Sequence, residues 1–75
     1  MKDYYKILEI ERTASSDDIR KAYIRLIRKY HPDINPGNLR ANQKYQDVVE
    51  AYNILGNLDS RLKYSILINK KILLP

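Results

Sequence analysis

The sequence predicts an all-α domain, an antiparallel hairpin of two long helices with a short helix flanking it at each end. Two apolar stripes at helical spacing, separated by a loop rich in proline and asparagine, predict the hairpin. No segment alternates apolar and polar side chains as a half-buried strand does, so no sheet is expected. With 75 residues the chain can form one small core, without room for a cleft between two lobes.

The first short helix is expected over residues 4–10, capped by Asp3 and followed by a turn over residues 11–14. Residues 15–18 are a strong signal for the start of a second helix, because the Ser15 hydroxyl can cap it while Asp18 stands at the N3 position. Apolar side chains at helical spacing give this second helix one buried stripe, formed by Ile19, Ala22, Tyr23, Leu26, Ile27 and Tyr30.

The second helix is expected to stop at His31, because Pro32 disfavours helical backbone at the residue before it. Residues 31–38 carry two prolines, a glycine and two asparagines, which is typical of a loop. A third helix is expected from Leu39 or Arg40 to Leu55. Its apolar stripe is formed by Ala41, Tyr45, Val48, Val49, Tyr52 and Leu55.

A fourth, shorter helix is expected over residues 60–68. Gly56 is expected at the C′ position that ends the third helix, and Asn57 or Asp59 can cap the fourth. Three side chains of this helix are expected in the core, those of Leu62, Ile66 and Leu67.

The domain is expected to span residues 1–68 and to be followed by a C-terminal tail, residues 69–75. The last ten residues, 66–75, are apolar apart from Asn69, Lys70 and Lys71, and three interpretations of them stay open, namely the end of a helix, the start of a linker and the start of a truncated membrane segment. There are no cysteines and one histidine, so no metal site and no cofactor are expected. The absence of cysteines and of a secretory signal leads us to expect a cytoplasmic location for a monomeric domain that does not contact membranes.

The positive charge is concentrated in two segments of a chain whose net charge is +5. Residues 17–30 and residues 56–75 each contribute +3. On the second helix, Lys21, Arg25 and Arg28 follow at spacings of four and three and form one basic ridge. Such a ridge is either a solvated helix face or a docking surface for an acidic partner.

The tripeptide His31-Pro32-Asp33 follows this ridge directly and presents an imidazole and a carboxylate on a loop. One interpretation is structural, because a histidine can interact with the last carbonyls of a helix that the proline terminates. A catalytic pair is disfavoured, since no third group orients the two side chains and so small a domain offers no water-excluding pocket. The other interpretation is a contact site for a partner that also touches the ridge.

Five linked motifs, in order and over about residues 3–64, resemble the J-domain of the DnaJ co-chaperones. They are residues 3–8 (DYYKIL), 19–23 (IRKAY), 29–33 (KYHPD), 50–55 (EAYNIL) and 61–64 (RLKY). The resemblance implies a four-helix module that is no enzyme itself. It implies that the module binds the ATP-bound state of a DnaK-type (heat-shock-70 class) chaperone and stimulates ATP hydrolysis by that partner.

By the same resemblance, Asp33 is expected to pair with an arginine of the chaperone, with His31 and Pro32 supporting that contact. The docking face is expected to contain Arg20, Tyr23 and Arg25, with Lys21 and Arg28 adding positive field. The sequence departs from the family at Ile24, where the family usually has a lysine, and in the fourth helix at residues 59–61 and Ser65.

Two other functions stay open. A nucleic-acid-binding domain is disfavoured, because the loop of about eight residues is too long for a helix-turn-helix and residues 40–55 are electrically neutral. A scaffold that docks without stimulating is opposed by the intact His31-Pro32-Asp33 motif.

Overall fold

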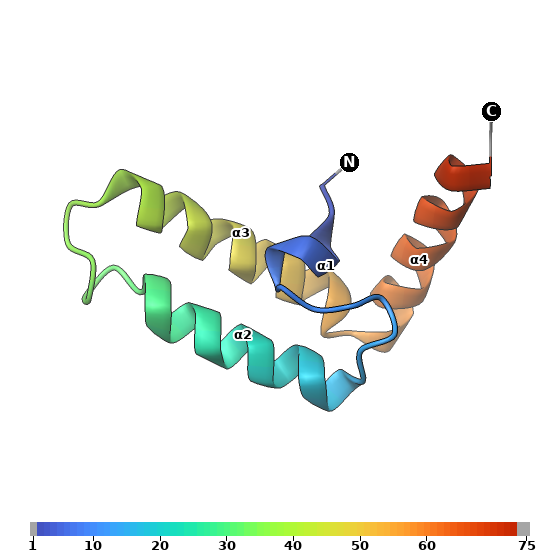
Figure 1. The fold of residues 1–75 in the computed structure, drawn as a ribbon, viewed down its shortest axis with the longest axis horizontal. Helices are drawn as coiled ribbons and strands as arrows, with labels where there is room; N and C mark the ends of the chain where they lie inside the picture. The colour runs from blue at the N-terminus through green and yellow to red at the C-terminus, as the bar shows by residue number, and fades with distance from the viewer. Residues whose placement is uncertain (1, 74–75) are drawn as a thin grey trace.

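The computed structural model describes residues 2–73, and their side chains as far as residue 68. This part of the chain is all-helical, as predicted, and α2 and α3 form an antiparallel hairpin against which α1 and α4 are placed (Figure 1). The helices are α1 (Tyr4–Ile7), α2 (Ser16–Tyr30), α3 (Leu39–Leu55) and α4 (Leu58–Leu73). Among the helices of residues 2–73, none combines the length and the apolar character that crossing a membrane requires.

The N-terminal caps predicted for α1, α2 and α4 are confirmed, at α1 by the Asp3 side chain, which accepts the Lys6 N–H, and α3 has a cap that was not predicted. At the start of α2 the Ser15 hydroxyl accepts a hydrogen bond from the Asp18 N–H at 3.1 Å, and the Asp18 carboxylate accepts one from the Ser15 N–H at 3.4 Å. The Asn38 side chain caps α3 by accepting the Ala41 N–H, at 3.0 Å. At α4, Asn57 accepts the N–H groups of the second and third helical residues. These caps satisfy donors that have no partner inside the helix.

Helix α1 is shorter than predicted, because the chain turns out of it at Glu9 rather than after Ile10. Glu9 has a φ of +57°, in the left-handed region. Its N–H bonds the Lys6 carbonyl, and the Ile10 N–H bonds the Tyr5 carbonyl, each at 3.0 Å. This is the Schellman pattern of helix termination, built here on a glutamate where glycine is the usual residue. Because no glycine stands at this position, the stop was not predicted.

Gly56 ends α3 for a reason other than the one predicted. It is the C-cap itself, with a φ of −78°, so no left-handed conformation is required. A Cβ at this position would lie 2.6 Å from the Tyr52 carbonyl oxygen and 2.9 Å from the Tyr52 ring. Close approach of the backbone to the preceding turn therefore requires a glycine here.

The core lies between α2 and α3 and is closed by α1 and α4. The predicted stripe of α2 is confirmed, with Ile19 and Leu26 fully buried, and α3 faces it with Val48 and Leu55. Ala51, which the predicted stripe omitted, is also fully buried. The described tyrosines of the two hairpin stripes are only half-buried. The most buried aromatic side chains instead come from the flanking helices, Tyr5 and Tyr64.

The prediction for α4 was wrong in its length and in its buried face. The helix has 16 residues and continues into the predicted tail, because no glycine or proline interrupts the sequence before Pro75. The three predicted core side chains are exposed, Leu62 by 60%, Ile66 by 48% and Leu67 by 51%. The side chains that turn inward instead follow the spacing i, i+3, i+4, i+7, and they are Arg61, Tyr64, Ser65 and Ile68.

Polar groups on the inner face of α4 explain this orientation. The Tyr64 hydroxyl donates to the Lys2 carbonyl at 2.6 Å and accepts the Tyr4 N–H at 3.0 Å. The Arg61 guanidinium donates to the carbonyls of Arg12 at 3.1 Å and Ala14 at 2.6 Å. Hydrogen bonds of this kind fix the angle at which a helix packs, whereas apolar contacts alone are non-directional.

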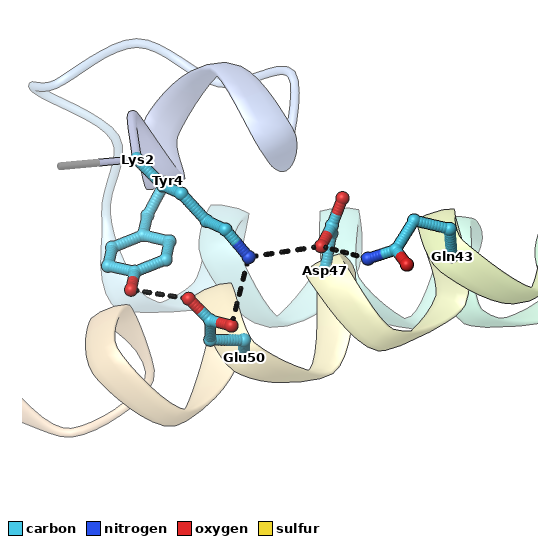
Figure 2. Close-up of polar contacts among 5 residues, drawn as sticks. All are labelled: Lys2, Tyr4, Gln43, Asp47 and Glu50. Carbon is cyan, nitrogen blue, oxygen red and sulfur yellow. Dashed lines mark hydrogen bonds and ion pairs between the residues drawn. The ribbon is translucent and has the colours of Figure 1, made fainter.

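A second set of polar contacts ties the N-terminus to α3 (Figure 2). The Tyr4 hydroxyl donates to one Glu50 carboxylate oxygen at 2.6 Å, and the Lys2 ammonium donates to the other at 3.1 Å. Lys2 also reaches Asp47 at 3.3 Å, which in turn accepts from Gln43 at 3.0 Å. The Tyr4 hydroxyl, and next the Lys2 ammonium, hold the pKa of Glu50 below its usual value.

Replacing this carboxylate should change how stability depends on pH. A carboxyl whose pKa is lowered in the folded state stabilises the fold above its usual pKa, and this contribution is lost as the pH falls through the lowered value. We expect Glu50→Gln to be less stable than wild type at neutral pH and to lose less stability between about pH 5 and pH 3. Chemical denaturation at several pH values measures this, with exposed Glu11→Gln as the control. Parallel pH profiles for wild type and Glu50→Gln would contradict it.

A second prediction concerns the end of α3. Because the added Cβ meets a backbone oxygen, Gly56→Ala should lower the free energy of unfolding by about 1–3 kcal/mol. Urea denaturation followed by circular dichroism measures the change. Gln46→Ala, at an exposed position of the same helix, is the control and should stay within about 0.5 kcal/mol of wild type. A Gly56→Ala variant as stable as that control would show that the turn relaxes without cost.

Candidate functional site

The loop that joins α2 to α3 holds Asp33 out into solvent. The backbone leaves the helical region at His31, with φ −58° and ψ 136°, as Pro32 at the next position requires. The Asp33 side chain is 91% exposed. Further along, Gly37 takes a left-handed φ of +73° that lets the chain turn back into α3. The loop thus presents one carboxylate at the end of the hairpin.

The His31 imidazole supports the backbone under Asp33. Its Nδ1 accepts a hydrogen bond from the Asp33 N–H at 3.1 Å, which places the proton of the neutral ring on Nε2. In this state the 3.7 Å separation between Nδ1 and the Asp33 carboxylate is no ion pair. The ring meets Tyr45 of α3 edge to face, with 5.6 Å between centroids. The histidine therefore links the loop to the hairpin.

Asn35 holds the other side of the loop. Its amide group donates to the Lys29 carbonyl at 2.9 Å and to the His31 carbonyl at 3.1 Å. The His31 carbonyl also accepts the backbone N–H groups of Ile34 and Asn35, each at 3.0 Å. These bonds satisfy carbonyls at the end of α2 and give the loop one defined conformation.

The predicted basic residues of α2 are all exposed, and three of them have carboxylate partners. Asp17 pairs with Arg20 at 3.0 Å and with Lys21 at 3.1 Å. The hydrogen bond from Arg20, followed by that from Lys21, lowers the pKa of Asp17. Arg25 lies 3.5 Å from Glu9, in the loop after α1. Much of the charge on this face is therefore compensated within the domain.

Arg28 differs from the other three, since no ion pair within residues 2–68 involves it. Ile24, one turn earlier, is 38% exposed and interrupts the basic ridge as the sequence indicates. Tyr23 is half-buried and stacks on Tyr52 of α3 with 4.0 Å between ring centroids and 14° between ring planes. It thus lies at the edge of the hairpin interface.

Sequence reasoning missed the acidic partners of the ridge and the loop contact of Asn35. Asp17 stands three and four residues before Arg20 and Lys21, a spacing that itself predicts helical ion pairs. The pairing of Glu9 with Arg25 depends on how α1 and its following loop pack, and no local pattern carries that information.

Comparison with known proteins places this geometry in a family. The family model described as the DnaJ domain matches residues 3–65. Two relatives of 51% identity over 63 residues are the chaperone proteins DnaJ of Wolbachia pipientis subsp. Culex pipiens (strain wPip) and of Chlorobaculum tepidum, each match covering 84% of this chain. The chain spans only 17% and 16% of the length of these relatives.

A solved structure agrees with the sequence comparison. The crystal structure of the J-Trx1 fragment of ERdj5 superposes with a TM-score of 0.80 and 38% sequence identity, over 87% of this chain and 32% of that one. The matched family model covers most of the chain and includes α2, α3 and the loop between them. This chain therefore belongs to the DnaJ domain family.

Proposed function

We propose that this domain is a co-chaperone module that docks on a DnaK-type chaperone in its ATP-bound state and stimulates ATP hydrolysis by that partner. The observation that carries the proposal is the exposed Asp33 carboxylate on a loop whose backbone is fixed by His31 and Asn35. An ordered loop loses little conformational entropy on binding, so its one free carboxylate is well suited to meet a cation of a partner.

The basic face of α2 supports docking on an acidic surface. Arg20, Lys21, Arg25 and Arg28 are exposed along one helix that runs directly into the loop. A partner lying along α2 can therefore touch the face and the loop together. Opposite charges on two surfaces mainly raise the association rate and fix the orientation of the complex.

The domain would then act through differential binding. A charge-assisted hydrogen bond from Asp33 to a chaperone arginine contributes roughly 1.5–3 kcal/mol. If the contact is available only in the hydrolysis-competent conformation of the chaperone, its free energy shifts the population toward that conformation. The hydrolysis remains the chemistry of the partner.

Asp33→Asn should abolish the stimulation while leaving the fold intact. The substitution keeps the size of the side chain but removes the charge, and the exposed carboxylate contributes little to packing. Single-turnover ATP hydrolysis by a DnaK-type chaperone, with wild type and variant, measures the effect. Thermal melts followed by circular dichroism verify that both fold alike.

Two results would contradict the proposal. Wild type that leaves the hydrolysis rate unchanged over a wide concentration range would show that this domain does not stimulate that class of chaperone. Full stimulation by a correctly folded Asp33→Asn variant would remove Asp33 from the mechanism.

The unequal charge compensation on α2 gives a further prediction. Arg28 has no carboxylate partner within residues 2–68, whereas Lys21 pairs with Asp17. Arg28→Ala should therefore slow association with the chaperone more than Lys21→Ala, by about threefold, and the difference should shrink in high salt. Stopped-flow or surface binding kinetics at two salt concentrations measure both variants. Equal effects would show that the internal ion pairs do not screen this face.

A further inference from the structure

A basic groove lies beside the loop, between the C-terminal end of α2 and the N-terminal end of α3. It has a volume of about 230 Å³. Its lining includes three cationic side chains, an aromatic ring and two amides, from Lys29, Arg40, Lys44, Tyr30, Asn35 and Asn38. We call the surface formed by Lys29, Tyr30, Arg40 and Lys44 the basic groove. None of these four belongs to the predicted docking residues.

The charges of the basic groove are uncompensated. No ion pair or hydrogen bond within residues 2–68 engages the side chains of Lys29, Arg40 or Lys44. The Lys29 and Lys44 ammonium groups lie 5.3 and 5.6 Å from the centroid of the Tyr30 ring. Two like charges beside one ring, with no carboxylate lining the groove, favour the entry of an anion.

The groove continues toward α1. A neighbouring groove of about 140 Å³ shares Tyr30 and Lys44 with it and adds Lys6. The two acids in that second groove are already engaged, Glu9 with Arg25 and Asp47 with Lys2. The positive surface is therefore extended along the hairpin, which suits a stretch of polypeptide with several carboxylates better than one small ion.

Asn35 connects the basic groove to the loop. It lines the groove while its amide holds the Lys29 and His31 carbonyls. A protein bound at Asp33 therefore has the groove within reach, on the side of the hairpin that carries α1.

We propose that the basic groove binds an acidic segment of the chaperone, as a second contact separate from the face of α2. This inference rests on the proposed function for the identity of the partner. The groove itself, as a site for carboxylate-rich polypeptide, depends only on Lys29, Arg40, Lys44 and Tyr30.

The test compares Arg40→Glu/Lys44→Glu with a control of equal charge change, Arg12→Glu/Lys63→Glu, on the opposite end of the domain. Affinity for the ATP-bound chaperone is measured for both variants. We expect the affinity for the chaperone to fall by about tenfold in the groove variant and by about twofold in the control.

In parallel, the ¹⁵N-labelled domain is titrated with a short polyglutamate peptide, and with polyglutamine as the neutral control.

In the titration we expect polyglutamate to shift the backbone amide signals at positions 29, 40 and 44 in wild type and in Asp33→Asn, but not at the same positions of the groove variant. Equal chaperone affinities for the two double variants would overturn the second contact and leave the proposed function standing. A wild type that does not bind the chaperone would overturn the proposed function and the identity of the partner, while the polyglutamate shifts would still decide on the groove. Absence of those shifts would overturn the groove as a carboxylate site.

Discussion

The packing of α2 against α3 is the contact on which the rest of the domain depends. Fully buried Ile19 and Leu26 meet Val48 and Leu55 across the hairpin, and each such side chain contributes roughly 1.5–3 kcal/mol when it leaves water. This contact sets the distance between the two ends of the loop, and it supplies the surface of α3 on which α1 and α4 pack. The loop of residues 31–38 needs no core of its own because its position is determined by the hairpin beneath it.

Local signals in the sequence predicted most of the hairpin, and non-local contacts account for what was missed. The capping box of Ser15 and Asp18 spans four residues, so the sequence contains it whole. The orientation of α4 instead depends on Tyr64 reaching the first residues of the chain. Leucine and isoleucine side chains lie on the outer face of that helix as well as on its inner face. A prediction from hydrophobicity alone therefore took the wrong face of α4 to be buried. The loop motif was recognisable from sequence, whereas the pairing of Arg25 with Glu9 was not.

The hairpin surface has one region where basic side chains form ion pairs within the domain and another where they do not. Along the first turns of α2, carboxylates of the domain itself neutralise the basic side chains. Toward the loop end of the hairpin the cations of both helices are unpaired within the described side chains, from Arg28 to Lys44. Unpaired positive side chains thus lie at the same end of the hairpin as Asp33, the one exposed carboxylate of the loop. A net charge of +5 does not reveal this distribution.

The hydroxyl of Tyr64 joins positions that are far apart in the sequence, with partners 60 and 62 residues away. Closing a loop of that length costs more chain entropy than closing the short connection between α2 and α3. Contacts within the hairpin therefore close shorter loops than the contacts that join α4 to the N-terminal residues. The loop of residues 31–38 therefore belongs to the part of the domain that the more local contacts build.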